Sequence, residues 1–245
     1  MITATILTKN SQKTLKKTLD SLGNFSEVIV LDSGSSDETL TIAKKYANVK
    51  VHLSPFLGFG PMHNYATKLA NHDWILSIDS DEILSKELSK EILSLELDPE
   101  KIYSVQRHNF FNGKRIKWCG GWHPDWVTRL YHRSKTGFSE DLVHEKVKPS
   151  DLILTPLKHP LSHTPYAEIG DFLDKMQCYS ELFAEQNAGE IATVPQALFH
   201  SWFAFIKSYL FKLGFLGGKE GFIISMYNGH SAFYKYLKLA ERSKN

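Results

Sequence analysis

The sequence lacks most of the features that would place it outside ordinary globular proteins. Its two cysteines, Cys119 and Cys178, have a spacing that fits neither a metal site nor a disulfide framework, so we expect reduced thiols and a cytoplasmic protein. The first residues carry no basic stretch with a cleavage site, and we expect them to form a strand rather than a signal peptide. No phosphate-binding P-loop, internal repeat or low-complexity linker is present.

An excess of charge of either sign is also missing, because the net charge is only +2, and we expect no nucleic-acid partner. The distribution is uneven, however. Residues 198–245 carry seven Lys or Arg against two Glu, and they hold 12 of the 30 aromatic residues. Basic and aromatic residues are therefore concentrated in this C-terminal segment, whereas the rest of the chain is mildly acidic. Such an uneven distribution indicates that the segment forms a surface with a role of its own.

The first hundred residues alternate between strand-like and helix-like segments. Apolar, β-branched runs predict strands at 2–7, 27–31, 49–53 and 74–78, and helical spacing predicts helices at 11–22, 37–46, 61–71 and 85–95. From about residue 101 the pattern changes to strand-like pieces at 103–108 and 127–131. This alternation predicts an α/β fold with a mostly parallel sheet, whose ligand crevice lies at the carboxyl ends of the strands.

An acidic group follows the fourth predicted strand, in the order Asp79, Ser80, Asp81, Glu82. If the strand continued, Asp79 and Asp81 would lie on the same face, and two adjacent carboxylates stay ionised only beside a cation. Hard oxygen ligands suit Mg²⁺ or Mn²⁺ holding a diphosphate. The alternative is a solvated acidic turn before the next helix.

A second polar segment, Asp32 to Asp37, follows the second predicted strand. A carboxylate in that place commonly accepts hydrogen bonds from a base or a ribose, while Gly34 permits close backbone approach. The alternative is local, because a Ser-Ser-Asp sequence is simply a good helix cap.

A third segment, residues 118–126, contains three Trp, two Gly and one Pro. Aromatic walls are typical of sugar-binding sites, since pyranose C–H faces pack on rings. A core plug or a protein contact is the alternative.

The motifs taken in order resemble the GT-A glycosyltransferases of family 2. They are Thr8-Lys-Asn10, Asp32-Ser-Gly-Ser-Ser-Asp37, Gly58-Phe-Gly-Pro-Met-His-Asn64 and Asp79-Ser-Asp81. Three further motifs resemble the bacterial lipopolysaccharide-core β-1,4-glucosyltransferases: Trp122-His-Pro-Asp-Trp126, Arg129-Leu-Tyr131 and Val143-His-Glu145. The resemblance covers roughly residues 1–165. It implies a GT-A domain over these residues and a helical extension over residues 166–245.

The resemblance also implies a set of site residues. Nucleotide-sugar binding is assigned to Thr8, Asn10, Asp32, Ser33, Asn64 and Asp79, with Asp32 on the uracil or ribose. A divalent cation, Mg²⁺ or Mn²⁺, is assigned to Asp81 and Asp79, with His163 as a third contact to the metal or the diphosphate. Acceptor or sugar contacts are assigned to Trp122, Trp126 and Arg129.

The implied reaction is the inverting transfer of a hexose, expected to be glucose, from a UDP-sugar donor to a lipopolysaccharide-core or related glycolipid acceptor. Such a displacement needs a base for the acceptor hydroxyl. We expect Glu145, with Asp125 as the second candidate. The sequence departs from the family pattern in two places: His63 stands where an Arg often precedes the Asn, and His144-Glu145 replaces the frequent Glu-Asp base motif. A sugar-nucleotidyltransferase and a non-catalytic nucleotide- or sugar-binding module are the alternatives.

The tail segment 198–216 is apolar but contains Lys207 and Lys212, so we expect no membrane-spanning helix. Its large apolar residues recur at helical spacing, in the order Trp202, Phe203, Ile206, Tyr209, Leu210 and Leu213. This pattern predicts a helix lying on an anionic membrane surface, with the protein peripheral on the inner face of the cytoplasmic membrane. Packing on the body or on a partner subunit is the alternative.

Overall fold

The computed structural model describes residues 1–142, 145–148, 151–166 and 168–243. Within it the chain forms two compact units. The first contains Met1–Arg107 and Trp126–His163, and the second contains His108–Asp125 and Thr164–Asn245. From the sequence we expected a single division near residue 165. In the structure the second unit also contains the segment His108–Asp125. That segment lies there because Phe111, Ile116 and Trp122 share a hydrophobic cluster with Phe172 and Ile224.

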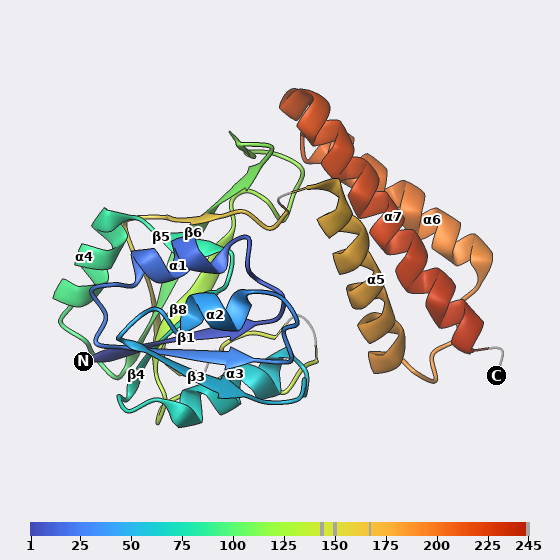
Figure 1. Cartoon of the computed structure of the whole chain (residues 1–245). Helices are drawn as coiled ribbons and strands as arrows, with labels where there is room; N and C mark the ends of the chain where they lie inside the picture. The colour runs from blue at the N-terminus through green and yellow to red at the C-terminus, as the bar shows by residue number, and fades with distance from the viewer. Residues whose placement is uncertain (143–144, 149–150, 167, 244–245) are drawn as a thin grey trace. The chain divides into compact units, whose positions relative to one another are not determined.

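The first unit is built on a mostly parallel sheet (Figure 1). Four parallel strands lie in the order β3 (Val49–Leu53), β2 (Glu27–Asp32), β1 (Ile2–Thr8) and β4 (Trp74–Asp79). The sheet continues through antiparallel β8 (Trp126–His132) and β6 (Lys101–Phe111). The remaining strands of this unit are short: β5 (Glu82–Leu84), β9 (Ile153–Pro156) and β10 (Leu161–His163).

Helices cover both faces of the parallel strands (Figure 1). Alternation along β1 places Ile2, Ala4 and Ile6 against one face, where they share a core cluster with Leu15 and Leu19 of α1 (Leu15–Ser21). The same cluster includes residues of α2 (Thr39–Ala43) and α4 (Lys86–Ser94). On the other face, α3 (Phe59–Leu69) packs on β1 and β2. The predicted α/β architecture is therefore confirmed.

The predicted elements are all present, and their ends differ by a few residues. The first helix, expected from residue 11, begins at Leu15, because Ser11 to Thr14 form a turn in which the Ser11 carbonyl accepts from the N–H groups of Thr14 and Leu15. The helix expected at 85–95 is α4, and the Ser85 side chain caps it by accepting from the Leu88 N–H at 3.0 Å.

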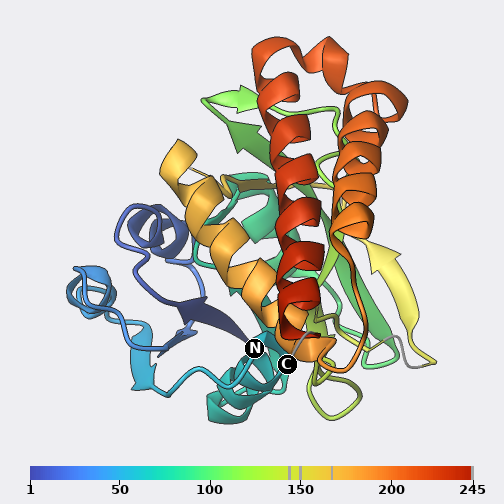
Figure 2. The ribbon, with the colours of Figure 1, turned by 90° about the vertical axis from the view of Figure 1, so that its right-hand side faces the viewer.

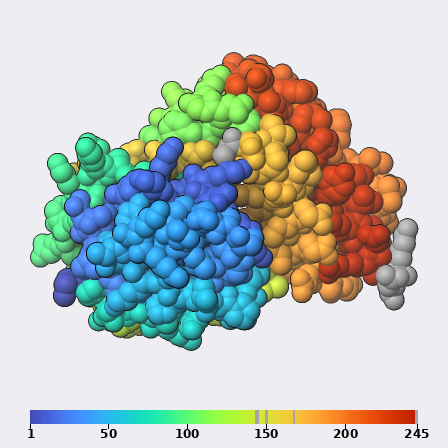
Figure 3. All heavy atoms as spheres, viewed as in Figure 1, coloured from blue at the N-terminus to red at the C-terminus, as the bar shows by residue number. Residues whose placement is uncertain are grey.

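The second unit contains the short strand β7 (Lys114–Arg115) and three long helices. These helices are α5 (Ile169–Gln186), α6 (Val194–Ile206) and α7 (Gly218–Arg242). Helix α7 packs on both α5 and α6, and Figure 2 shows the three side by side. In the space-filling view, the gold atoms of α5 and the red atoms of α7 form adjoining surfaces (Figure 3).

The tail helix expected over residues 198–216 is correct in type but wrong in extent. Helix α6 begins at Val194, where Thr193 caps it, and ends at Ile206. It is followed by a π-helical turn, η1 (Lys207–Phe211), and a 3₁₀ turn, η2 (Gly214–Gly217). Leu213 has a φ of 55°, a left-handed conformation that ends the helix and reverses the chain into α7. No helix among the described residues is long and apolar enough to cross a membrane.

Candidate active site

The polar residues predicted at the ends of different strands lie at one edge of the sheet. The strand register pairs Thr8 with Asp32 and Leu7 with Asp79. Because parallel strands end at the same edge, the side chains of the first, second and fourth strands come together there although they are far apart in sequence. This edge is the candidate active site.

Asp32 holds the segment that follows it. Its buried carboxylate accepts hydrogen bonds from the N–H groups of Gly34 and Ser35, at 2.9 and 2.8 Å, and from the hydroxyls of Ser35 and Thr8, at 2.5 and 3.0 Å. Ser33 donates through its N–H to the Thr8 carbonyl at 3.0 Å. The Asp32 carboxylate therefore organises the turn after the strand.

Asn10 links this turn to the end of β1. It has a φ of 51°, its side-chain oxygen accepts from the Ser36 N–H at 2.8 Å, and its own N–H donates to the Ser35 hydroxyl at 2.8 Å. The two loops after β1 and β2 are therefore cross-linked into one rim. Asn10 is exposed on this rim.

The arrangement of Asp79 differs from the expected pair of carboxylates around a cation. Asp79 accepts a hydrogen bond from the guanidinium of Arg129 at 2.5 Å, and Arg107 lies 3.7 Å away. Arg129 also donates to Glu82 at 2.5 Å, and Glu82 is completely buried. Burial alone would raise the pKa of the Asp79 carboxyl, but Arg129 and Arg107 outweigh it and hold that pKa well below its usual range. Arginine thus supplies the positive charge that the acidic pair was expected to need.

Asp79 and Asp81 do not share a strand face, because β4 ends at Asp79 and residues 80 and 81 form a turn. The alternation expected from an extended strand therefore does not apply. Asp81 instead lies beside His163, with 3.4 Å between its Oδ1 and the imidazole Nε2. This contact forms because β10 pairs antiparallel with β5, which follows the turn. Asp81 and His163, both predicted to contact the cation, are thus neighbours, and Arg129 is a buried ion-pair partner of the acidic segment rather than an exposed sugar contact.

A carboxylate and an imidazole beside a further carboxylate suit a divalent cation that keeps substrate oxygens and water as its other ligands. No group of three or more His, Cys, Asp or Glu side chains positioned to hold a metal occurs among the described residues. Asp81 of this turn and the neighbouring His163 are two side chains that could ligate a cation.

Glu145 lies beside His63 of α3. Its Oε1 is 3.7 Å from the Nε2 of His63, and about one-fifth of its side chain is exposed. Burial raises the pKa of the Glu145 carboxyl to about 7, and the negative charge of Asp79 acts in the same direction. A carboxylate with a pKa near neutrality is well suited to act as a general base. The neighbouring His144, part of the predicted base motif, lies outside the described residues.

His63, which departs from the family pattern, is a buried neutral residue. Its Nδ1 lies 3.2 Å from the Ser77 hydroxyl, and its ring stacks on Phe138 at 4.2 Å between centroids. Burial lowers the pKa of His63 to about 4, in spite of the negative charge of Asp79. At neutral pH it therefore presents an uncharged ring to Glu145.

The motif from Gly58 to Asn64 has a role that the sequence did not reveal. Asn64 donates to the Phe138 carbonyl at 3.0 Å and to Glu140 at 2.8 Å, and it accepts from the Phe138 N–H at 2.9 Å. A side chain at Gly60 would collide with the Ser139 carbonyl, because a Cβ there would lie only 1.9 Å from that oxygen. The motif was expected to support the nucleotide pocket, but its contacts instead fix the segment that leads to Glu145.

The two ends of that segment are joined by backbone pairing. Phe138 and Val147 form a β-bridge, and the Ser139 N–H donates to the Lys146 carbonyl at 2.8 Å. Glu145 therefore stands two residues before a buried anchor, Val147. The large sequence distance between Asn64 and this loop explains why no local pattern indicated the contact.

The candidates in the aromatic segment have different environments. Trp122 is buried and stacks on Tyr166 in the second unit, so the core-plug alternative describes it better than a sugar-binding wall. Asp125 also belongs to the second unit, where it accepts from the Asn109 side chain at 2.9 Å. Trp126 belongs to the first unit, with about half of its surface exposed, which leaves it available for a sugar.

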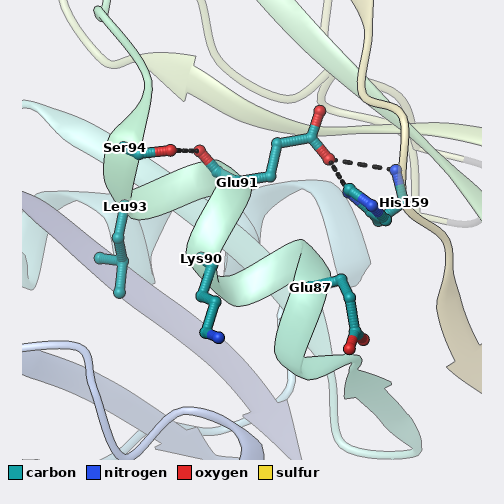
Figure 4. Close-up of a pocket in the computed structure, with 6 residues that line it drawn as sticks. All are labelled: Glu87, Lys90, Glu91, Leu93, Ser94 and His159. Carbon is teal, nitrogen blue, oxygen red and sulfur yellow. Dashed lines mark hydrogen bonds and ion pairs between the residues drawn. The ribbon is translucent and has the colours of Figure 1, made fainter.

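A shallow pocket on α4 is separate from these residues (Figure 4). Glu91 accepts there from the His159 N–H at 3.0 Å and contacts the His159 ring at 2.8 Å. None of the predicted site residues lines the pocket. His159 thus ties its loop to α4, a structural role.

Comparison with known proteins decides the family. The model of glycosyl transferase family 2 matches residues 3–150, more than half of the chain, and this range includes the site residues described above except His163. The chain belongs to glycosyl transferase family 2. The resemblance inferred from the motifs is confirmed.

Two curated relatives align over nearly the whole family 2 chain. An uncharacterized glycosyltransferase of Rickettsia bellii is 28% identical over 99% of this chain and 87% of its own length. The lipopolysaccharide core biosynthesis glycosyltransferase LpsC of Rhizobium meliloti is 25% identical over 98% of this chain and 92% of its own. The similarity therefore includes the C-terminal helices as well as the family domain.

Solved structures confirm the GT-A fold of this family 2 protein. S. aureus TarS 1–349, solved in complex with UDP-GlcNAc, superimposes with a TM-score of 0.52 at 18% identity over 99% of this chain and 91% of its own. The mannosyltransferase PcManGT of Pyrobaculum calidifontis, solved with GDP-Man and Mn²⁺, gives 0.55 at 14% identity over 97% and 86%. At these identities the likeness establishes the fold.

Proposed function

We propose that this family 2 enzyme transfers a hexose, expected to be glucose, from a UDP-sugar to a lipopolysaccharide-core or related glycolipid acceptor, with inversion at the anomeric carbon. The observation that carries the proposal is the placement of Glu145, a carboxyl with a pKa of about 7, near the acidic end of β4. The names of LpsC and of TarS with UDP-GlcNAc support the acceptor class and the donor class.

The donor side is assigned to the rim and to the acidic turn. Thr8, Asn10 and Ser33 lie at the rim formed by the loops after β1 and β2, where a nucleoside fits against backbone groups fixed by Asp32. Asp81 and His163, with Asp79, would hold Mg²⁺ or Mn²⁺, which neutralises the charge that develops on the leaving diphosphate. The PcManGT complex with GDP-Man and Mn²⁺ supports this use of a metal.

Arg129 and Arg107 hold the acidic residues of this turn in place. Arg129 is almost fully buried and bridges Asp79 and Glu82, so it neutralises charge inside the protein and keeps Asp79 ionised. Arg129 therefore positions the acidic turn and makes no direct contact with the acceptor in this proposal.

The acceptor side is assigned to Glu145. Its carboxylate takes the proton of the acceptor hydroxyl while that oxygen forms a bond to the anomeric carbon and the bond from this carbon to the diphosphate breaks. One displacement inverts the configuration. A positioned base contributes roughly 10²–10⁴-fold to such a rate. Trp126, half exposed in the first unit, is the candidate wall for a sugar ring.

A glycolipid acceptor also assigns a place in the cell. We propose that the enzyme works as a peripheral protein at the inner face of the cytoplasmic membrane, where such acceptors are assembled from cytoplasmic nucleotide sugars. Its basic, aromatic C-terminal region supports attraction to anionic lipids.

The experiment is a panel assay of UDP and GDP sugars with the purified protein, with release of free nucleotide measured with and without Mn²⁺ or Mg²⁺. The expected result is metal-dependent release from a UDP-hexose, faster in the presence of a lipopolysaccharide-core acceptor. Glu145→Gln should bind the nucleotide but lose transfer, and Glu185→Gln, an exposed acid on α5, is the matched control. Release of pyrophosphate from UTP and a sugar phosphate would instead indicate a nucleotidyltransferase. Binding without any turnover would indicate a non-catalytic module.

A further inference from the structure

Helix α6 and the turn after it expose large apolar side chains that a water-soluble helix would normally bury. Six large apolar side chains on its outward side are exposed: Leu198, Phe199, Trp202, Phe203, Leu210 and Phe211. We call this set the outer face. Trp202 is 61% exposed and Phe211 is 71% exposed. A helix of a soluble protein normally buries its apolar stripe and exposes polar residues. Contiguous apolar surface of this kind marks an interaction site.

The contact of α6 and η1 with α7 combines small residues and rings. Ser208 of η1 and both Gly229 and Ser225 of α7 are buried, and the His200 ring of α6 stacks on Tyr236 of α7 at 3.8 Å between centroids. A Cβ at Gly229 would lie 3.2 Å from the Ser201 carbonyl oxygen, so the two helices approach backbone to backbone there. This side of α6 is therefore already occupied by α7, and the outer face is the side left exposed.

Hydrogen bonds between side chains complete this interface. The Ser208 hydroxyl lies 3.0 Å from that of Ser225 and accepts from the Asn228 amide at 3.0 Å. Ser208 also donates to the Cys119 carbonyl at 3.0 Å. These polar groups are therefore paired with one another inside the unit, while the six apolar side chains of the outer face remain exposed.

The charge around the outer face identifies its occupant. There is no acidic residue between Glu190 and Glu220, whereas Lys207, Lys212 and Lys219 in that stretch are all exposed. Basic side chains beside exposed Trp and Phe suit the boundary between anionic headgroups and acyl chains. Two copies of this chain meeting through the same face would bring these lysines together and repel each other, since a two-fold interface pairs a surface with itself.

We propose that the outer face of α6 and η1 inserts into the headgroup and acyl-chain boundary of a bilayer that contains anionic lipids. The inference deepens the proposed function and rests on it for its purpose, which is to hold the enzyme at the surface where a glycolipid acceptor lies. Insertion goes further than electrostatic attraction, because it requires the aromatic side chains of the outer face to leave water. The binding energy therefore has an apolar part, resistant to salt, and a basic part, sensitive to salt.

The test uses the full-length protein and vesicles of phosphatidylcholine with or without phosphatidylglycerol. Phe199→Ser combined with Trp202→Ser should reduce vesicle affinity by about a hundredfold or more, from the apolar area lost. The matched control is Ile153→Ser combined with Leu154→Ser, two similarly exposed apolar residues of the first unit. Equal flotation of the outer-face variant and the native protein would overturn the proposal.

Two further readouts distinguish insertion from purely electrostatic adsorption and from dimer formation. Lipids brominated in their acyl chains should quench a part of the tryptophan fluorescence that disappears in Trp202→Phe. No difference in quenching between these two proteins would overturn insertion. Replacing Lys207, Lys212 and Lys219 by Gln should lower affinity for anionic vesicles by about a hundredfold and leave the salt-resistant part. A dimer in the absence of lipid that is lost in the outer-face variant, without vesicle binding by the native protein, would assign the face to a second copy.

These measurements are independent of turnover. The outer-face variant should keep its melting temperature and its nucleotide release from the UDP-sugar in solution, because none of its substitutions touches the candidate active site. Loss of vesicle binding with activity retained supports the inference. Vesicle binding by a protein without any glycosyl transfer would leave insertion established and refute only the proposed function.

Discussion

Replacing Glu145 by Gln should both abolish most of the activity and stabilise the protein. Its carboxyl has an ordinary pKa of 4.5, which burial raises to about 7 in the fold. The folded protein therefore binds this proton more tightly than the unfolded chain, so its stability falls as the pH rises from about 4.5 to about 7. At about 1.4 kcal/mol for each tenfold change, the ionised carboxylate costs the folded state about 3 kcal/mol above pH 7.

The amide introduced by Glu145→Gln carries no charge at any pH, so the variant escapes this cost. Urea denaturation should show Glu145→Gln to be more stable than the native protein by about 3 kcal/mol at pH 8 and by about 1 kcal/mol at pH 5. Glu185→Gln, on the exposed surface of α5, should show no such pH-dependent gain. In the same proteins, transfer should fall by about 10²–10⁴-fold for Glu145→Gln only.

The native pH profile gives an independent measurement of the same group. Since the base works when ionised, kcat/KM should rise about tenfold per pH unit below pH 7 and level off above it. A stability difference between Glu145→Gln and the native protein that is small and independent of pH would refute the argument from burial. Near-normal transfer by Glu145→Gln would remove this residue from the mechanism.

Three other changes test the surrounding geometry. Asn64→Ala removes three hydrogen bonds to the loop before Glu145, and it should lower kcat at least tenfold while nucleotide affinity stays unchanged. Steady-state kinetics measures kcat, and calorimetry measures the affinity. Weaker nucleotide binding with a normal kcat would instead assign Asn64 to the nucleotide pocket. Arg129→Leu leaves the buried Glu82 without its main ion-pair partner and should reduce the free energy of unfolding, measured in urea, by about 3–5 kcal/mol. A loss below about 1 kcal/mol would contradict the buried ion pair between Arg129 and Glu82. Asp81→Asn should raise the Mn²⁺ concentration needed for half-maximal activity by tenfold or more, whereas an unchanged metal requirement would assign the cation elsewhere.

The alternation of apolar runs determined the first unit of the fold. Val28 to Leu31 is a continuous apolar run and Trp74 to Ile78 is interrupted only by Ser77, and strands of a parallel sheet buried on both faces have such runs. The same pattern placed Asp32 and Asp79 after strand ends, and the parallel arrangement then brought them to one edge. These conclusions depend only on local periodicity and on general rules of chain connection, so the sequence was sufficient.

Contacts between distant segments were decided by tertiary structure alone. Arg129 lies fifty positions after Asp79 and still neutralises it, because β8 pairs with β4. The turn after β4 separated Asp79 from Asp81, and the sequence alone left both the shared strand face and the acidic turn open. Asn64 reaches the loop of Glu145 only through packing on the far side of the sheet.

The C-terminal helices also show the difference between what the sequence determined and what only the tertiary structure decided. The composition of this region predicted an apolar, basic helix, but a helical stripe can face either a neighbour or the surroundings. Only the packing of α6 on α7, with the close approach at Gly229 and the stack of His200 on Tyr236, decided that the large apolar side chains of the outer face are exposed. Periodicity fixes which residues share a face, whereas the steric fit between two helices decides which face is buried.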